Sequence, residues 1–146
     1  MYRKILVALE NSSADESLLP HVAELAGLLH SQLLLVHVAD GWVARNFERM
    51  KLAESEEIKA DRAYLEQTAE KLRQAGLSVN AQLAMGDPPA ELLKTAEKEN
   101  CDLIAMSSHV HRWLGDFVFG STTHEVRHRT SIPVLIVKAK AARKKQ

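Results

Sequence analysis

Short runs of apolar residues alternate along the chain with longer stretches whose apolar positions recur every three or four residues. The apolar runs are Ile5–Leu9, Leu33–Val38, Leu103–Met106 and Val134–Val137. Runs of this length are typical of strands that are covered on both faces, as in a parallel sheet. A fifth segment, Val79–Leu83, alternates apolar and polar residues, which indicates a strand at the edge of the sheet with one exposed face.

The stretches between these runs have the periodicity of amphipathic helices. The first predicted helix carries its apolar stripe on Leu18, Val22, Leu25 and Leu29. The second carries its stripe on Ile58, Leu65, Ala69 and Leu72 and is expected to end near Gly76, since glycine commonly follows the last helical turn.

The starts of three helices have sequence signals of their own. Ser13 and Glu16 have the spacing of a capping box at the start of the first helix. Asp87 followed by Pro88 predicts the N-cap and the first position of another helix. A last helix is expected over Ser121–Arg129.

The repeated order of strand and helix predicts one α/β doubly wound domain. We expect a five-stranded, mainly parallel sheet with helices on both faces. Residues 39–54 carry no clear pattern and are predicted to form a loop that leads into the long second helix.

Composition excludes several classes of protein. The chain has 146 residues, the length of one domain, and 46% of them are hydrophobic, enough for a buried core. Its 19 basic and 19 acidic residues leave no basic excess of the kind that nucleic-acid binding needs. The single Cys101 suits a reducing compartment, and the apolar run Ile5–Leu9 is too short for a signal peptide or a membrane span. We therefore expect a cytoplasmic protein with neither a membrane nor a nucleic acid as partner.

A ligand site is expected beyond the carboxyl ends of the strands, where open parallel sheets bind their ligands. Two segments lie there, Glu10–Ser13 and Ser107–Gly120. The second leads into Ser121 and Thr122 at a predicted helix start, where unpaired N–H groups and hydroxyls favour an anion. The alternative is that Ser121 or Thr122 only caps its own helix.

Several segments resemble the universal stress protein family, in the same order and with the same spacing. They are Tyr2–Leu9, Leu35–Val38, Gly86–Pro88, Cys101–His109, Gly120–Ser121 and Ile132–Val137. The resemblance implies a universal stress protein domain over residues 1–138. The basic composition of residues 139–146 predicts a disordered tail, with contact to an acidic partner or a nucleic acid as the alternative. The resemblance also implies the strand order 3-2-1-4-5, which places Val79–Leu83 at one edge of the sheet and Val134–Val137 at the other.

The resemblance further implies a nucleotide motif, which this chain carries in altered form. Members that bind ATP have glycine at three positions and serine or threonine after the third, where this chain has Ser107, Val110, Gly120 and Ser121. Val110 resists the positive φ that glycine allows, and its side chain blocks close approach of a phosphate to the backbone. Ser107 is a milder change, because its hydroxyl can donate to a phosphate.

Other positions of the implied nucleotide site are also recognisable. Glu10 stands where ATP-binding relatives carry aspartate, and Val38 and Met106 match positions that wall the adenine pocket. Ordinary core packing is the alternative for both apolar residues. Positive charge near a phosphate is expected from His109, His111 and Arg112.

A metal site and an enzymatic site find less support. His124 and His128 lie four residues apart on a predicted helix, and either His109 or His111 would complete a zinc site. We favour a solvated helix face there and assign no metal ligand. No nucleophile stands beside a base in a known motif, so we expect no catalysis beyond weak ATP turnover.

Two functions follow. The first is a non-catalytic cytoplasmic stress-response protein with a degenerate nucleotide crevice, which acts as a homodimer through protein partners whose identity the sequence leaves open. The dimer is expected through the apolar edge strand at Val134 and Ile136, because an uncovered apolar edge favours association and resembling proteins pair this strand with its twofold mate. The second is an adenine-nucleotide sensor, with ATP as its candidate cofactor, whose occupancy regulates partner binding. Val110 favours the first function.

Overall fold

The computed structural model describes residues 1–39, 56–108 and 121–140. Its five strands form one all-parallel sheet in the order β3-β2-β1-β4-β5. The strands are β1 (Lys4–Leu9), β2 (Gln32–Ala39), β3 (Ser78–Met85), β4 (Leu103–Ser108) and β5 (Val134–Lys138). The helices are α1 (Asp15–Leu29), α3 (Glu56–Gln74), α4 (Pro88–Lys98) and α5 (Ser121–Arg129). The predicted α/β fold and strand order are thus confirmed.

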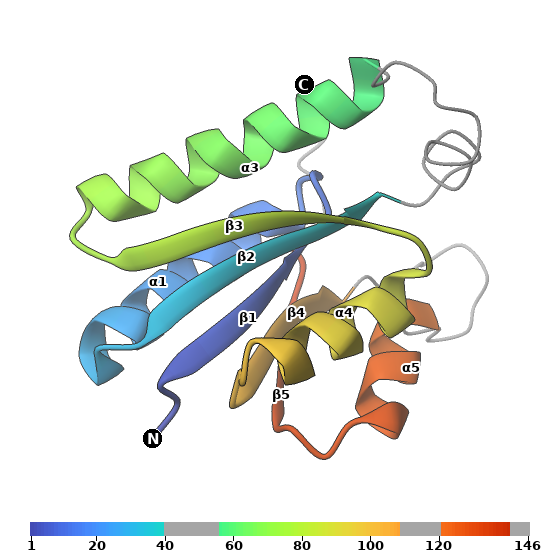
Figure 1. Cartoon of the computed structure of the whole chain (residues 1–146). Helices are drawn as coiled ribbons and strands as arrows, with labels where there is room; N and C mark the ends of the chain where they lie inside the picture. The colour runs from blue at the N-terminus through green and yellow to red at the C-terminus, as the bar shows by residue number, and fades with distance from the viewer. Residues whose placement is uncertain (40–55, 109–120, 141–146) are drawn as a thin grey trace.

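Helices cover both faces of the sheet, with α1 and α3 on one face and α4 and α5 on the other (Figure 1). Side chains of β1 alternate between the two resulting cores: Ile5 and Val7 pack towards α1 and α3, whereas Leu6 packs towards α4 and α5. Because β1 lies at the centre of the sheet, all three side chains are fully buried. This double burial is the physical reason that the apolar runs are continuous in the sequence.

The first helix differs from its prediction at both ends. The capping box of Ser13 and Glu16 is wrong, because α1 has Ala14 at its N-cap and no side chain caps it. Leu29, placed on the apolar stripe, is 38% exposed, and Ala26 takes the buried position after Val22.

The helix start predicted at Asp87 and Pro88 is confirmed. The Asp87 carboxylate accepts a hydrogen bond from the N–H of Ala90 at 3.3 Å, and Pro88 is the first residue of α4. This cap fixes the point at which the chain leaves β3 and turns into α4.

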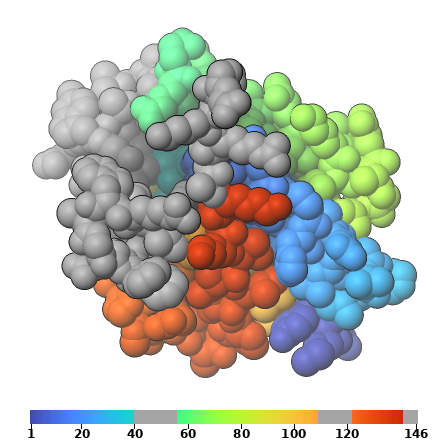
Figure 2. Space-filling view, turned by 180° about the vertical axis from the view of Figure 1, so that it is seen from behind, coloured from blue at the N-terminus to red at the C-terminus, as the bar shows by residue number. Residues whose placement is uncertain are grey.

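The two sheet edges are β3 and β5, as expected. Val134, Leu135, Ile136 and Val137 of β5 are only half-buried. The end of β5 lies on the surface beside α1 (Figure 2), and just after it Lys140 donates its N–H to the Ser17 hydroxyl of α1. Residues 141–146 of the expected disordered tail lie outside the described residues.

The loop expected over residues 39–54 falls almost entirely outside the described residues as well. Ala39, its first residue, is the last residue of β2. In the part of the chain that the structure describes, no helix is long and apolar enough to cross a membrane.

Candidate functional site

A cleft of about 290 Å³ opens at the carboxyl ends of β1, β2 and β4. Its apolar lining comes from Ala8, Leu9, Val38, Pro88, Leu92 and Met106. Its polar lining comes from Glu10, His37, Ser107, Thr122 and Thr123. The strands supply the floor, and the first turns of α4 and α5 supply the sides, which is where doubly wound sheets bind ligands.

Five of the residues predicted for the nucleotide site lie together in this cleft: Glu10, Val38, Met106, Ser107 and Thr122. Ser121 begins α5 as expected. His109, Val110 and Gly120 lie outside the described residues.

Six further lining residues were not predicted as part of the site: Ala8, Leu9, His37, Pro88, Leu92 and Thr123. Ala8 and Leu92 carry the ordinary pattern of core positions, and nothing in their sequence context marks them as lining a cleft. Thr123 directly follows Ser121 and Thr122, and its hydroxyl at the same helix start could have marked it as a site residue.

Among the described residues, Ser107 carries the buried polar side chain of the cleft that has no hydrogen-bond partner. The residue is 3% exposed, and its hydroxyl has no hydrogen-bond partner among the described residues. Its main-chain carbonyl, in contrast, accepts a hydrogen bond of 3.5 Å from the Thr123 hydroxyl. A buried hydroxyl without a partner is unfavourable unless a ligand or water satisfies it.

The start of α5 adds donors to the same side of the cleft. Residues 121–123 form its first turn, whose backbone N–H groups have no acceptors within the helix. Thr122 and Thr123 both line the cleft. An anion at this end of α5 therefore meets N–H groups and the positive end of the helix dipole.

Glu10 lies on the opposite side, in the loop between β1 and α1. Its carboxylate accepts a hydrogen bond from the Ser12 hydroxyl at 3.2 Å. The two ends of the cleft therefore differ in charge. The donors at the start of α5 favour an anionic group of a ligand, and the Glu10 carboxylate favours hydroxyl or amino groups.

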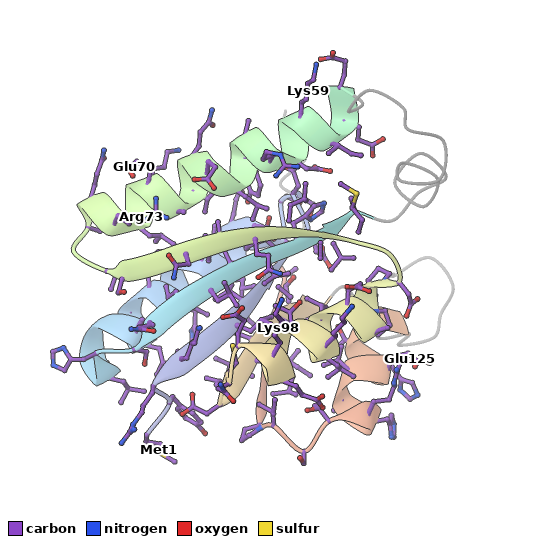
Figure 3. All side chains as sticks on the ribbon, viewed as in Figure 1. Met1, Lys59, Glu70, Arg73, Lys98 and Glu125 are labelled. Atoms are coloured by element: carbon purple, nitrogen blue, oxygen red, sulfur yellow. The ribbon has the colours of Figure 1, made fainter. Side chains whose placement is uncertain are left out.

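The two histidines of α5 lie apart from the cleft lining. Both are exposed, and their rings pack with centroids 4.4 Å apart. Glu125, between them in the sequence, is on the outer side of α5 (Figure 3). Within the described ranges, no three histidine, cysteine, aspartate or glutamate residues are grouped to hold a metal ion, and the predicted third ligands His109 and His111 are not among the described residues.

Comparisons with known proteins agree with this architecture. Residues 1–138 match the model of the Universal stress protein family. Universal stress protein MJ0577 of Methanocaldococcus jannaschii is 31% identical over 160 residues, which cover 96% of this chain and 97% of that protein. The solved structure of MJ0577 superposes with a TM-score of 0.82 at 30% identity, over 97% of this chain and 99% of that one.

Two further solved structures share the fold at lower identity. The universal stress protein from Archaeoglobus fulgidus in complex with dAMP has a TM-score of 0.70 and 22% identity, covering 94% of this chain and 98% of that one. A universal stress protein in complex with cAMP has a TM-score of 0.67 and 18% identity, covering 95% of this chain and 98% of that one.

Proposed function

Because this chain belongs to the universal stress protein family, we propose that it is a stress-response protein that binds an adenine nucleotide in the cleft between β1, β2 and β4. The Ser107 hydroxyl, which has no hydrogen-bond partner among the described residues, carries this proposal. It is a buried donor beside the start of α5, in a cleft that also has an apolar lining. A nucleotide has the matching parts, an apolar base and an anionic phosphate.

The solved structures with dAMP and cAMP support the same class of ligand. ATP, the candidate cofactor considered in the sequence analysis, is the first nucleotide to test. The cleft gives Ser107 no hydrogen-bonding base among the described residues, and for this reason we infer a role in binding rather than in catalysis, with at most weak ATP turnover.

The sequence favoured a protein that acts without a ligand, because Val110 replaces a glycine. In that alternative the fold and the protein partners are the same, but the cleft binds no nucleotide. In both cases we propose a cytoplasmic homodimer that pairs through β5, where Val134 and Ile136 are half-buried at the sheet edge.

Ser107→Ala separates the two functions. Removing a buried hydroxyl that has no partner leaves the melting temperature of the free protein unchanged or slightly raised. The same change weakens binding if the hydroxyl donates to the nucleotide. We therefore expect millimolar ATP with Mg²⁺ to raise the melting temperature of the wild-type protein, and to raise that of Ser107→Ala by clearly less.

Ser31→Ala is the matched control. Ser31 is equally buried, but its hydroxyl donates to the Tyr2 carbonyl at the opposite end of the sheet. This variant should melt earlier and keep the full shift with ATP. A wild-type protein that shows no shift overturns nucleotide binding and leaves the ligand-free function.

A further inference from the structure

A group of buried polar side chains lies behind the loop that carries Glu10, on the face of the sheet covered by α1 and α3. Asp15, the first residue of α1, is 1% exposed. One of its carboxylate oxygens accepts the N–H of Glu10 and the other accepts the N–H of Asn11, both at 2.9 Å. The two backbone groups that follow β1 are therefore held by one side chain.

Tyr64 of α3 completes this arrangement. Its hydroxyl donates to the Asp15 carboxylate at 2.6 Å, across 49 residues of sequence. Burial and the neighbouring Asp15 carboxylate raise the pKa of Tyr64 far above its usual value. The hydroxyl thus keeps its proton and remains a donor to Asp15 at any physiological pH.

A second carboxylate of α3 holds the next part of the loop. The Asn11 side-chain amide donates to Asp61 at 2.7 Å, and Asp61 is 8% exposed. Asn11 has a φ of 57°, a left-handed conformation that asparagine tolerates better than most residues. His37 of β2 lies with Nε2 3.4 Å from the Asp61 carboxylate and with Nδ1 2.9 Å from the Leu9 carbonyl.

These contacts connect α3 with the cleft through the loop and through His37, which lines the cleft and contacts Asp61. Asp15, Asp61 and Tyr64 do not line the cleft, whereas Glu10, whose backbone they hold, does. Their common effect is to fix the loop's shape from behind.

We propose, on the basis of the function proposed above, that Asp15 and Tyr64 are positioning residues of the cleft, which couple its occupancy by a nucleotide to the position of α3. The hydrogen bonds among the loop, Asp15 and Tyr64 hold Glu10 in the position in which it lines the cleft. A ligand that contacts Glu10 favours that arrangement, and by linkage a displaced α3 lowers the affinity of the cleft.

Tyr64→Phe tests this coupling, because it removes one hydroxyl and keeps the ring. Amide hydrogen exchange of Glu10 and Asn11 is followed by NMR in the free protein, and the affinity for MgATP is measured by calorimetry well below the melting temperature. We expect faster exchange at both amides and an affinity lower by about fivefold or more. Tyr2→Phe is the control: it makes the same chemical change in a half-buried tyrosine before β1 and should alter neither quantity.

Asn11→Gly is the second variant, to be used also if Tyr64→Phe does not fold. It removes the hydrogen bond to Asp61 and allows the positive φ. The same two changes are expected from it.

The outcomes distinguish the coupling from the proposed function. Unchanged exchange at Glu10 and Asn11 overturns the coupling, and so does faster exchange with unchanged affinity for MgATP. A wild-type protein that binds no MgATP overturns the proposed function and the coupling together.

Discussion

Asp102 ties the first residues of the chain to the turn before β4. Its two carboxylate oxygens accept the N–H groups of Arg3 at 2.9 Å and of Lys4 at 3.0 Å. Burial opposes the charged form of Asp102, but hydrogen bonds from the backbone of Arg3, Lys4 and Asp102 itself outweigh it and hold the pKa below its usual value. The charged carboxylate therefore stabilises the folded state.

This shift gives a pH-dependent prediction. Asp102→Asn should lower the free energy of unfolding by about 0.5–1 kcal/mol at pH 7, a modest value because the site is partly exposed to solvent. A lowered pKa in the folded state contributes stability above the unfolded pKa of about 3.9, and this contribution is lost as the pH falls through the folded pKa. Urea unfolding of both proteins at neutral and at strongly acidic pH should show the difference narrowing in acid; a difference that is constant with pH would contradict the prediction.

The hydrogen bonds of the polar residues behind the Glu10 loop could not be predicted from the sequence. The hydrogen bonds from Asn11 to Asp61 and from Tyr64 to Asp15 join residues about 50 positions apart, so no local pattern contains them. One signal was available: Asp61 lies between Ile58 and Leu65 on the buried stripe of α3. An acidic residue at an apolar position of a helix indicates a buried partner.

The α4 N-cap can be tested against the cap that α1 lacks. Asp87→Ala should lower the free energy of unfolding by about 1 kcal/mol, because it leaves the N–H of Ala90 without its acceptor. Ser13→Ala, at the position where a capping box was expected, should change it by less than about 0.5 kcal/mol. Chemical denaturation of the two variants measures both values, and an equal loss in both would mean that Ser13 caps α1 in solution.

The sequence located every described helix and strand, and it placed Leu18 and Val22 correctly on the buried face of α1, but it did not fix which side chains of the last turns face the sheet. Leu25, Ala26, Leu28 and Leu29 present apolar side chains on two neighbouring stripes, so periodicity alone allows either to face the sheet. In the structure Ala26 is buried and Leu28 is largely exposed. The small alanine brings α1 close to the strands, and this close packing depends on the partner surface rather than on the helix itself.

For the whole molecule, the fold class followed from the residues and the strand order from the resemblance. Apolar runs on both faces indicate parallel strands, but any order of the inner strands would give the same runs. Of the candidate site, Glu10 and Ser107 were predictable because the topology places the segments after β1 and β4 at the same edge of the sheet, whereas Val38 and Met106 were assigned to the site by the resemblance. Val110 and Gly120, on which the two functions differ, lie outside the described residues.

The proposed homodimer can be tested by placing a charge on β5. Ile136→Lys places a charge on the half-buried strand that we expect to pair with its twofold mate, and it should convert a dimer into a monomer at micromolar concentration. Asn80→Lys adds the same charge at an exposed position of the opposite edge strand and should leave the dimer intact. Analytical ultracentrifugation reads both results, and a wild-type protein that sediments as a monomer at all concentrations would rule out the dimer.

The central place of β1 also determines how a growing chain can fold. On one side β1 pairs with β2, which follows it soon in the sequence. On the other side it pairs with β4, and the contacts there join residues 98 positions apart. At a synthesis rate of about 5–20 residues per second, the second edge of this apolar strand stays open on the ribosome for about 5–20 s. A nascent chain with such an edge is a natural client for chaperones during translation.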